Sequence, residues 1–416
     1  MPAAPNQREF ALDVVRRLRA AGHEALWAGG CVRDSLLGAP PKDYDVATSA
    51  RPDAVRELFG PRRTLAIGAS FGVITVLGGK PLEPIEVATF RTDGVYRDGR
   101  RPQSVAYSDA QHDAQRRDFT INGLFYDPLS EQVVDYVGGV ADLEARLVRA
   151  IGDPARRFAE DKLRMLRAVR FTAALEFELD PQTLAAIRAM AGEVQAVSAE
   201  RIGGELRRIL AHRSRLRGVS LLAEAALLAP VLPEVGEHAD RGDDAWHASL
   251  ARLSRLAAEA SFPLALACLV AGLVEPERAG RLGRRLRLSN REIDHAVWLV
   301  RQLPALREAA LLPWPRLQRL LAHEHGRELV ELAAADAATD DPGIARCRAV
   351  LAEPPSQWNP PPVVTGDDLI AAGIGAGRHF AELLEHLRDE QLEGRAATRE
   401  AALAAARAWL QGRGRG

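Results

Sequence analysis

The stretch Leu26-Trp-Ala-Gly-Gly-Cys-Val-Arg-Asp-Ser-Leu-Leu-Gly38 decides how the N-terminal part of this sequence folds. Gly29 and Gly30 stand between a short apolar run and residues 32–37, which we expect to form a helix. Glycines at such a turn let the backbone approach a ligand, and the N–H groups that begin a helix favour an anion. The pattern predicts a strand, a turn and a helix that present Gly30 and Arg33 to phosphate.

Two aspartates follow in Lys42-Asp-Tyr-Asp-Val-Ala-Thr48, which resembles a strand. Alternate residues of a strand share a face, so Asp43 and Asp45 are expected side by side. Paired carboxylates repel unless a cation lies between them, and oxygen ligands suit Mg²⁺. We therefore expect Asp43 and Asp45 to be catalytic metal ligands. Glu86, in the predicted strand 85–90, is the candidate third catalytic carboxylate; its alternative is a solvent-facing strand position.

A second motif is Arg116-Arg-Asp-Phe-Thr-Ile-Asn122. Arg117 can reach a phosphate. Asp118 and Asn122 are four residues apart, which places them on one face if the segment is helical, where they could bind sugar hydroxyls.

A third motif, Glu160-Asp-Lys-Leu-Arg-Met-Leu-Arg167, lies in a predicted helix over residues 156–174. Asp161 and Arg164 are three apart, and one interpretation is an intrahelical salt bridge of ~0.2–0.5 kcal/mol. The other is base selection. Cytosine and adenine each present an amino donor beside a ring-nitrogen acceptor, which an Asp–Arg pair complements, whereas guanine and uracil present a carbonyl.

These motifs, in this order, resemble the class II nucleotidyltransferases, the family of bacterial-type tRNA CCA-adding enzymes and their poly(A) polymerase relatives. The resemblance implies a polymerase-β-like head and Mg²⁺-dependent transfer of C, C and A from CTP and ATP to the tRNA 3′ end. It also implies that the Asp161–Arg164 pair selects the base. The expected nucleotide-binding residues are Gly29, Gly30, Arg33, Arg117, Asp118, Asn122, Glu160, Asp161, Arg164, Arg167 and Arg170.

The fold class expected is α+β. Short strands (25–28, 43–47, 64–67, 72–77, 85–90), a hairpin (124–136) and two helices (8–21, 52–59) form the head, and helical periodicity dominates after Gly152. We expect a catalytic head over 1–150, a neck with base recognition over 151–215, a body over 216–352 and a tRNA-binding tail over 363–416. The proline-rich residues 353–362 are the expected linker.

Composition limits the remaining possibilities. The net charge is −1, so RNA must be attracted by local patches. One candidate is the basic run over 201–217, for which a solvated helix face is an equal alternative. Three widely spaced cysteines, no leading apolar region and no membrane-length apolar run predict a cytoplasmic protein without a membrane partner. The oligomeric state is not indicated.

The loop at residues 91–102 bears on which nucleotides are added. In the resemblance, a full-length loop here accompanies addition of the terminal A, which favours complete CCA addition. A poly(A) polymerase and a partial A-adding or CC-adding enzyme stay open as alternatives. A non-enzyme alternative, an RNA-binding scaffold with an inactive head, is disfavoured by the presence of Asp43, Asp45 and Arg33.

Overall fold

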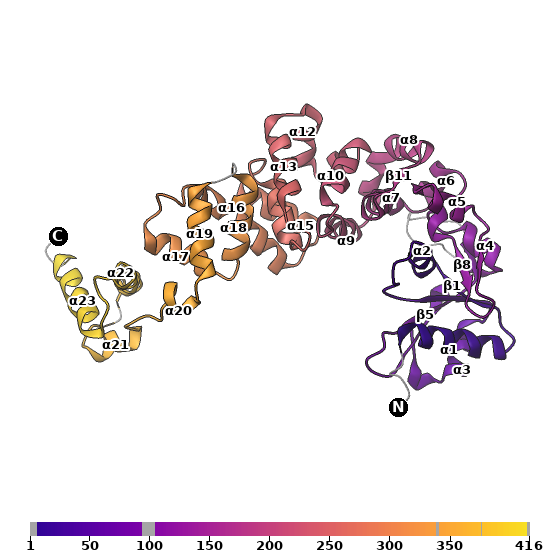
Figure 1. Cartoon of the computed structure of the whole chain (residues 1–416), viewed down its shortest axis with the longest axis horizontal. Helices are drawn as coiled ribbons and strands as arrows, with labels where there is room; N and C mark the ends of the chain where they lie inside the picture. The colour runs from indigo at the N-terminus through magenta and orange to yellow at the C-terminus, as the bar shows by residue number, and fades with distance from the viewer. Residues whose placement is uncertain (1–5, 94–104, 338–340, 376, 414–416) are drawn as a thin grey trace. The chain divides into compact units, whose positions relative to one another are not determined.

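The computed structural model describes residues 6–93, 105–337, 341–375 and 377–413 (Figure 1). The chain divides into two compact units. Residues 1–242 with 285–287 form the first unit, and residues 243–284 with 288–416 form the second. The head, expected to be α+β, lies in the first unit, and the described residues of the second unit are helical. The finer division into head, neck, body and tail stays a prediction.

A mixed seven-stranded sheet forms the centre of the head, with strand order β3-β4-β5-β2-β1-β8-β9. Only β2 and β5 pair in parallel among these strands; the other pairs are antiparallel. The predicted strands and the 124–136 hairpin are confirmed within one or two residues. The strands are β1 (Ala25–Ala28), β2 (Asp45–Thr48), β3 (Thr64–Gly68), β4 (Val73–Val76), β5 (Ile85–Thr89), β8 (Phe125–Asp127) and β9 (Gln132–Val134).

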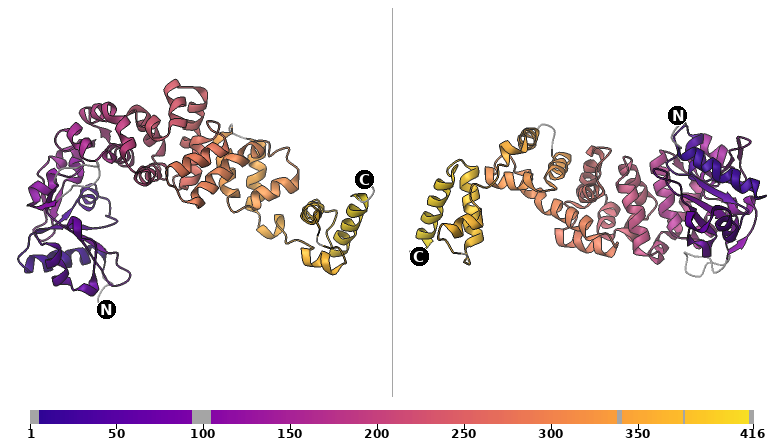
Figure 2. Two further views of the ribbon diagram at one scale, coloured as in Figure 1. Left: turned by 180° about the vertical axis from the view of Figure 1, so that it is seen from behind. Right: turned by 90° about the horizontal axis from the view of Figure 1, so that it is seen from below.

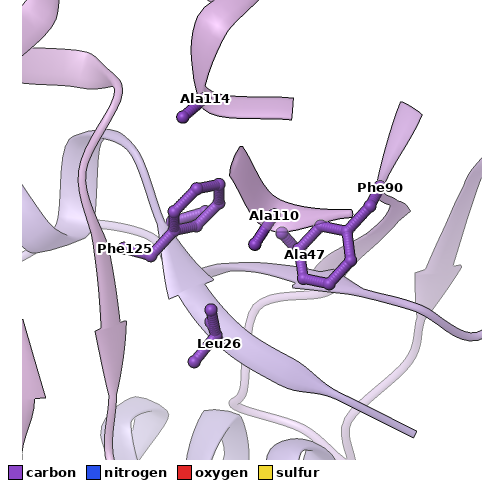
Figure 3. Close-up of a cluster of buried hydrophobic side chains, with 7 residues drawn as sticks. Leu26, Ala47, Phe90, Ala110, Ala114 and Phe125 are labelled. Carbon is purple, nitrogen blue, oxygen red and sulfur yellow. The ribbon is translucent and has the colours of Figure 1, made fainter. Parts of the chain in front are cut away.

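Apolar side chains cover both faces of this sheet because strand residues alternate between faces. Helices α1 (Gln7–Ala20) and α3 (Pro52–Phe59) contact one face, and α1 begins with a capping box between Asn6 and Glu9. On the opposite face, α4 (Ala110–Gln115) packs over a buried cluster (Figure 3). That cluster consists of Leu26, Ala28, Ala47, Phe90, Ala110, Ala114 and Phe125. Packing on both faces fixes β1 and β2, the strands that carry the first motif.

A short 3₁₀ helix, η3 (Thr120–Asn122), and helix α5 (Gly139–Glu144) lie against each other beside α2 (Gly30–Leu36). The Thr120 hydroxyl donates to Asp142 over 2.7 Å. The backbones approach so closely at Gly139 that a Cβ there would lie 2.2 Å from the Thr120 carbonyl oxygen. Only glycine fits at this position, and the close packing of α5 against η3 holds in place the backbone that carries Asn122.

Two small strand pairs were not expected. Strands β6 (Arg91–Asp93) and β7 (Val105–Tyr107) form an antiparallel ribbon, and β10 (Leu147–Val148) pairs in parallel with β11 (Glu178–Leu179). Most of the loop predicted over 91–102 lies outside the described residues.

The helix predicted over 156–174 is wrong as a single element. The structure has two helices, α6 (Pro154–Glu160) and α7 (Leu163–Leu175), because Asp161 is extended, with φ −146° and ψ 103°. The Asp161 carboxylate also accepts a hydrogen bond from the Leu163 N–H over 3.1 Å. The other helices of the first unit are α8 (Pro181–Met190), α9 (Ala199–Leu210), α10 (Arg215–Glu224), α11 (Leu228–Val231) and α12 (Pro233–Arg241).

The described part of the second unit is built from helices (Figure 2). The expected linker contains the short helix α20 (Pro355–Trp358), and the last three helices pack around Leu369, Leu383 and Leu387. No helix in the described part of the chain is both long enough and apolar enough to cross a membrane. The helices are α13 (Asp244–Arg255), α14 (Phe262–Val270), α15 (Pro276–Arg285), α16 (Asn290–Arg307), α17 (Trp314–Ala322), α18 (Gly326–Asp336), α19 (Pro342–Ala352), α20 (Pro355–Trp358), α21 (Gly366–Ala371), α22 (Phe380–Leu392) and α23 (Arg399–Arg413).

Gly139→Ala should destabilise the protein by about 1–3 kcal/mol, because the new methyl group overlaps the Thr120 backbone. Thermal unfolding measures this loss. The matched control is Gly204→Ala in helix α9, where no atom lies within 4 Å of the new Cβ and helix propensity predicts a small gain. Equal melting temperatures for the Gly139→Ala and unsubstituted proteins would contradict the close contact.

Candidate active site

A cavity of about 610 Å³ in the first unit brings the three motifs together. Its wall is mostly charged, with aspartates and arginines interspersed and few apolar side chains. The lining residues are Gly29, Gly30, Arg33, Asp34, Asp43, Asp45, Arg116, Arg117, Asp118, Asn122, Asp161, Leu163, Arg164, Arg167, Phe171 and Arg201.

The two aspartates of the first motif line this cavity from the start of β2. Strand β2 begins at Asp45, two residues later than predicted, so Asp43 precedes the strand. Tyr44 between them is buried and packs edge-on against Trp27, with ring centroids 4.8 Å apart. Glu86 is the register partner of Asp45 on the parallel strand β5, which directs both side chains to one face of the sheet. Glu86 is not among the lining residues.

The surroundings of Asp45 oppose the ionisation of its carboxyl group. The pKa of its carboxyl is raised to about 6, first because surrounding protein displaces water, and then because Glu86 and Asp43 repel its charge. Among the described residues, neither aspartate has an ion-pair partner within 4.0 Å. Two carboxylates with unmatched charge at a cavity wall fit a divalent cation. No group of three or more His, Cys, Asp or Glu side chains in the described part of the chain is arranged to hold a metal ion, and the catalytic role of Glu86 stays a prediction.

A chain of hydrogen bonds joins the first motif to helix α7. Arg33 donates to Asp34 over 2.8 Å and to the Asn122 amide oxygen over 2.7 Å. Asn122 donates to Asp118 over 3.2 Å, and Asp118 accepts two bonds from Arg167, at 2.8 and 2.5 Å. Asp118 and Asn122 thus meet, as predicted, although residues 116–122 form a bend and a 3₁₀ turn and not a continuous helix.

Arg117 occupies the space beneath the glycine turn. It donates to Asp113 over 3.1 and 3.2 Å and to the Asn122 carbonyl over 3.3 Å, and its charge partly opposes the rise in the pKa of Asp45. A Cβ on Gly29 would lie 3.0 Å from the Arg117 guanidinium, and Gly29 has φ +72°. Both facts explain why glycine is needed at this position.

Asp161 and Arg164 do not pair with each other. Asp161 forms an ion pair with Arg201, and Arg164 forms one with Glu160 over 2.9 Å. The shared helix expected for Asp161 and Arg164 is therefore wrong, because the chain breaks between α6 and α7. Both residues nevertheless line the same cavity, so the structure leaves their proposed joint role open.

Glu160 and Arg170 were predicted to bind nucleotide, but neither is among the lining residues. Glu160 is held by Arg157 and Arg164, and Arg170 donates to the buried Glu205 over 2.6 Å. Their visible role is to fix α7 against its neighbours.

Sequence reasoning did not assign five lining residues to the site. Phe171 contacts three arginines, including Arg33 at 5.3 Å and Arg167 at 5.2 Å from guanidinium to ring centre. It lies four residues after Arg167 on one helix, a spacing that could have revealed it. Asp34 and Arg116 are the direct neighbours of predicted residues. Nothing in the local sequence signals that Leu163 or Arg201 lines the cavity.

The basic run over 201–217 does not form one open cationic face. Arg201 forms an ion pair with Asp161, and Arg208 forms one with Glu205. Arg215 is only 1% exposed and donates to the Leu210 carbonyl. Its members therefore serve several different sites, including the cavity and the core.

Asp118→Asn should destabilise the protein at neutral pH by on the order of 1–2 kcal/mol. Although burial opposes ionisation, the Arg167 guanidinium holds the pKa of Asp118 near 2, below its ordinary 3.8. A lowered pKa means that the ionised form stabilises the fold above about pH 4, and this stability is lost as the pH falls toward 2. Urea unfolding at pH 7 and pH 3 measures the difference. The control is Glu178→Gln, which removes an exposed ion pair with Arg217 and should cost less. Equal losses in the two variants would contradict the assignment.

Family models match two parts of the chain. Residues 25–149 match a model described as "Poly A polymerase head domain". Residues 176–238 match a model described as "Probable RNA and SrmB- binding site of polymerase A".

Curated and solved proteins resemble the chain, some over nearly its whole length and others over little more than half of it. The CCA-adding enzyme of Enterococcus faecalis is 34% identical over 405 residues, 94% of each chain. The CCA-adding enzyme of Limosilactobacillus fermentum is 40% identical over 238 residues, and that match spans 58% of the relative's length. The crystal structure of the Bacillus stearothermophilus CCA-adding enzyme in complex with CTP is 29% identical, with a TM-score of 0.82 over 99% of this chain and 100% of that one. The chain belongs to the CCA-adding enzyme family of tRNA nucleotidyltransferases, as its motifs had predicted.

Proposed function

We propose that this protein adds C, C and A to the 3′ end of tRNA from CTP and ATP, without a nucleic-acid template. One observation carries the proposal: the acidic pair Asp43 and Asp45 lines the same cavity as Asp161 and Arg164. In this proposal, the first pair binds the triphosphate through a metal ion and the second pair contacts the base. Three buried free cysteines are compatible with the cytoplasmic location that we propose.

In the proposed reaction, the 3′ hydroxyl oxygen of the RNA attacks the α-phosphorus of the bound triphosphate and loses its proton. The bond from that phosphorus to the bridging oxygen breaks, and pyrophosphate leaves. Arg33 and Arg117 offer positive charge to the triphosphate, although both are also held by carboxylates. Mg²⁺ held by Asp43 and Asp45 would neutralise charge that develops on the phosphate oxygens. Glu86 is the proposed third carboxylate.

For the base, we propose that Asp161 accepts from the exocyclic amino group of cytosine or adenine and that Arg164 donates to the adjacent ring nitrogen. Uracil and guanine would place a carbonyl against the Asp161 carboxylate. Arg164 already donates to the backbone carbonyls of Arg116 and Arg157, each over 3.0 Å, so its guanidinium is fixed in the cavity wall before a nucleotide arrives. A donor held in one position can select between bases, because it cannot move to accommodate a different base edge.

The function is tested by incubating the protein with tRNA that lacks CCA, CA or A, with each nucleoside triphosphate separately. We expect C to be added to the first two RNAs and A to the third. Repeated A addition to unrelated RNA would indicate a poly(A) polymerase, and a restriction to C or to A would indicate a partial enzyme. No incorporation would favour an RNA-binding scaffold.

Asp43→Asn and Asp45→Asn should each abolish incorporation, because a single remaining carboxylate cannot order a cation and a triphosphate together. The Asp45 variant should stay folded. A raised carboxyl pKa means that ionisation opposes folding, so neutralising Asp45 at pH 7 relieves repulsion. Single-turnover incorporation and thermal unfolding measure the two effects, with Asp53→Asn on helix α3 as control. Near-normal turnover in either site variant would remove the assignment.

Asp161→Ala should lower discrimination against UTP and GTP by roughly ten- to a hundredfold, because the acceptor that requires an amino donor is lost. The measurement is single-turnover incorporation of all four triphosphates. A folded, active variant that still selects C and A would refute base reading by Asp161.

A further inference from the structure

Arg201 and Asp161 form a two-point ion pair in the cavity wall. Arg201 Nη1 donates to Asp161 Oδ1 over 3.1 Å, and Nη2 donates to Oδ2 over 2.7 Å. The two side chains are 23% and 16% exposed, so the pair is largely shielded from water. Arg201 lies in the first turn of α9, forty residues along the chain from Asp161.

The contacts leave a defined vacancy on the Asp161 carboxylate. An ionised carboxylate has about four acceptor positions, two on each oxygen. Oδ1 accepts from Arg201 and from the Leu163 N–H, so both of its positions are used. Among the described residues, Oδ2 accepts only from Arg201. One acceptor position therefore remains, on Oδ2, in a side chain that lines the cavity.

We propose that Arg201 is a positioning residue for base selection, which holds Asp161 so that this one acceptor meets the amino group of the incoming base. The inference rests on the function proposed above. A freely rotating carboxylate could present either oxygen, or could hold a water that donates to a carbonyl and so accommodates uracil or guanine. Because Arg201 binds both carboxylate oxygens and the Leu163 N–H binds one of them, the carboxylate can neither present its other oxygen nor hold such a water.

The guanidinium matters beyond its charge. Arg201 engages both carboxylate oxygens at once with a rigid planar fork, whereas a lysine ammonium is a single point of contact on a flexible stem. Lysine at this position would keep the ion pair but would let the carboxylate rotate. Arg208, on the same helix, is the natural comparison, because it pairs with Glu205 and its side chain is 62% exposed.

The test compares Arg201→Ala, Arg201→Lys, Arg208→Ala and Asp161→Ala in single-turnover incorporation of CTP, UTP, ATP and GTP. The readout is the ratio of kcat/KM for CTP over UTP and for ATP over GTP, with thermal unfolding alongside. We expect Arg201→Ala to lower both ratios about tenfold, Arg201→Lys to lie between it and the unsubstituted protein, and Arg208→Ala to change neither. If Arg201→Ala does not fold, Arg201→Lys decides alone.

Loss of activity in equal proportion for all four triphosphates, with both ratios unchanged, would show that Arg201 only supports the fold and would overturn the inference. Unchanged ratios in the Arg201 variants together with collapsed ratios in Asp161→Ala would overturn this inference and leave the proposed function intact. Unchanged ratios in Asp161→Ala would overturn base reading by Asp161, and the role of Arg201 with it.

Discussion

The ion pair between Asp118 and Arg167 is the contact on which the arrangement of the site depends. Asp118 is buried, and a buried carboxylate is tolerated only with a matched cation and hydrogen bonds. It receives both from α7 and from Asn122, which in turn accepts from Arg33. Removing Arg167 would leave the buried Asp118 carboxylate without its cation, so the chain of contacts depends on this ion pair. It fixes the glycine turn against the helix that carries the proposed base-reading arginine.

Some charged side chains in the cavity wall are paired and others are not. The paired ones hold the wall in place, and we assign the unpaired ones to the chemistry. Its arginines are held by carboxylates or backbone carbonyls before any ligand arrives, which fixes their donors in space. Among the described residues, Asp43 and Asp45 have no ion-pair partner, and burial, followed by repulsion from Glu86 and Asp43, raises the pKa of Asp45 to about 6. Charge left unmatched at a cavity wall is a cost to the fold, and a bound cation with a triphosphate offsets it.

The proposed base selection requires that Asp161 and Arg164, the groups that would contact the base, cannot rotate. Arg164 is fixed by Glu160 and two backbone carbonyls, and Asp161 by Arg201 and the Leu163 N–H. A template-free enzyme must distinguish a donor from an acceptor at one position on the base edge. It can do so only if its own groups cannot rotate to accommodate the wrong base.

Local patterns in the sequence determined the strands of the sheet, the glycine turn, the acidic pair and the family. Each of these features depends on residues close together in the chain: alternation, Gly29 with its positive φ, and two carboxylates flanking Tyr44. Tertiary structure decided which charges pair. The spacing of Asp161 and Arg164 suggested one helix, but the helix breaks at Asp161. The ion-pair partner of Asp161 is Arg201, forty residues away in the chain. Ion pairs between distant segments depend on how α7 and α9 pack, and local periodicity carries no information about that packing.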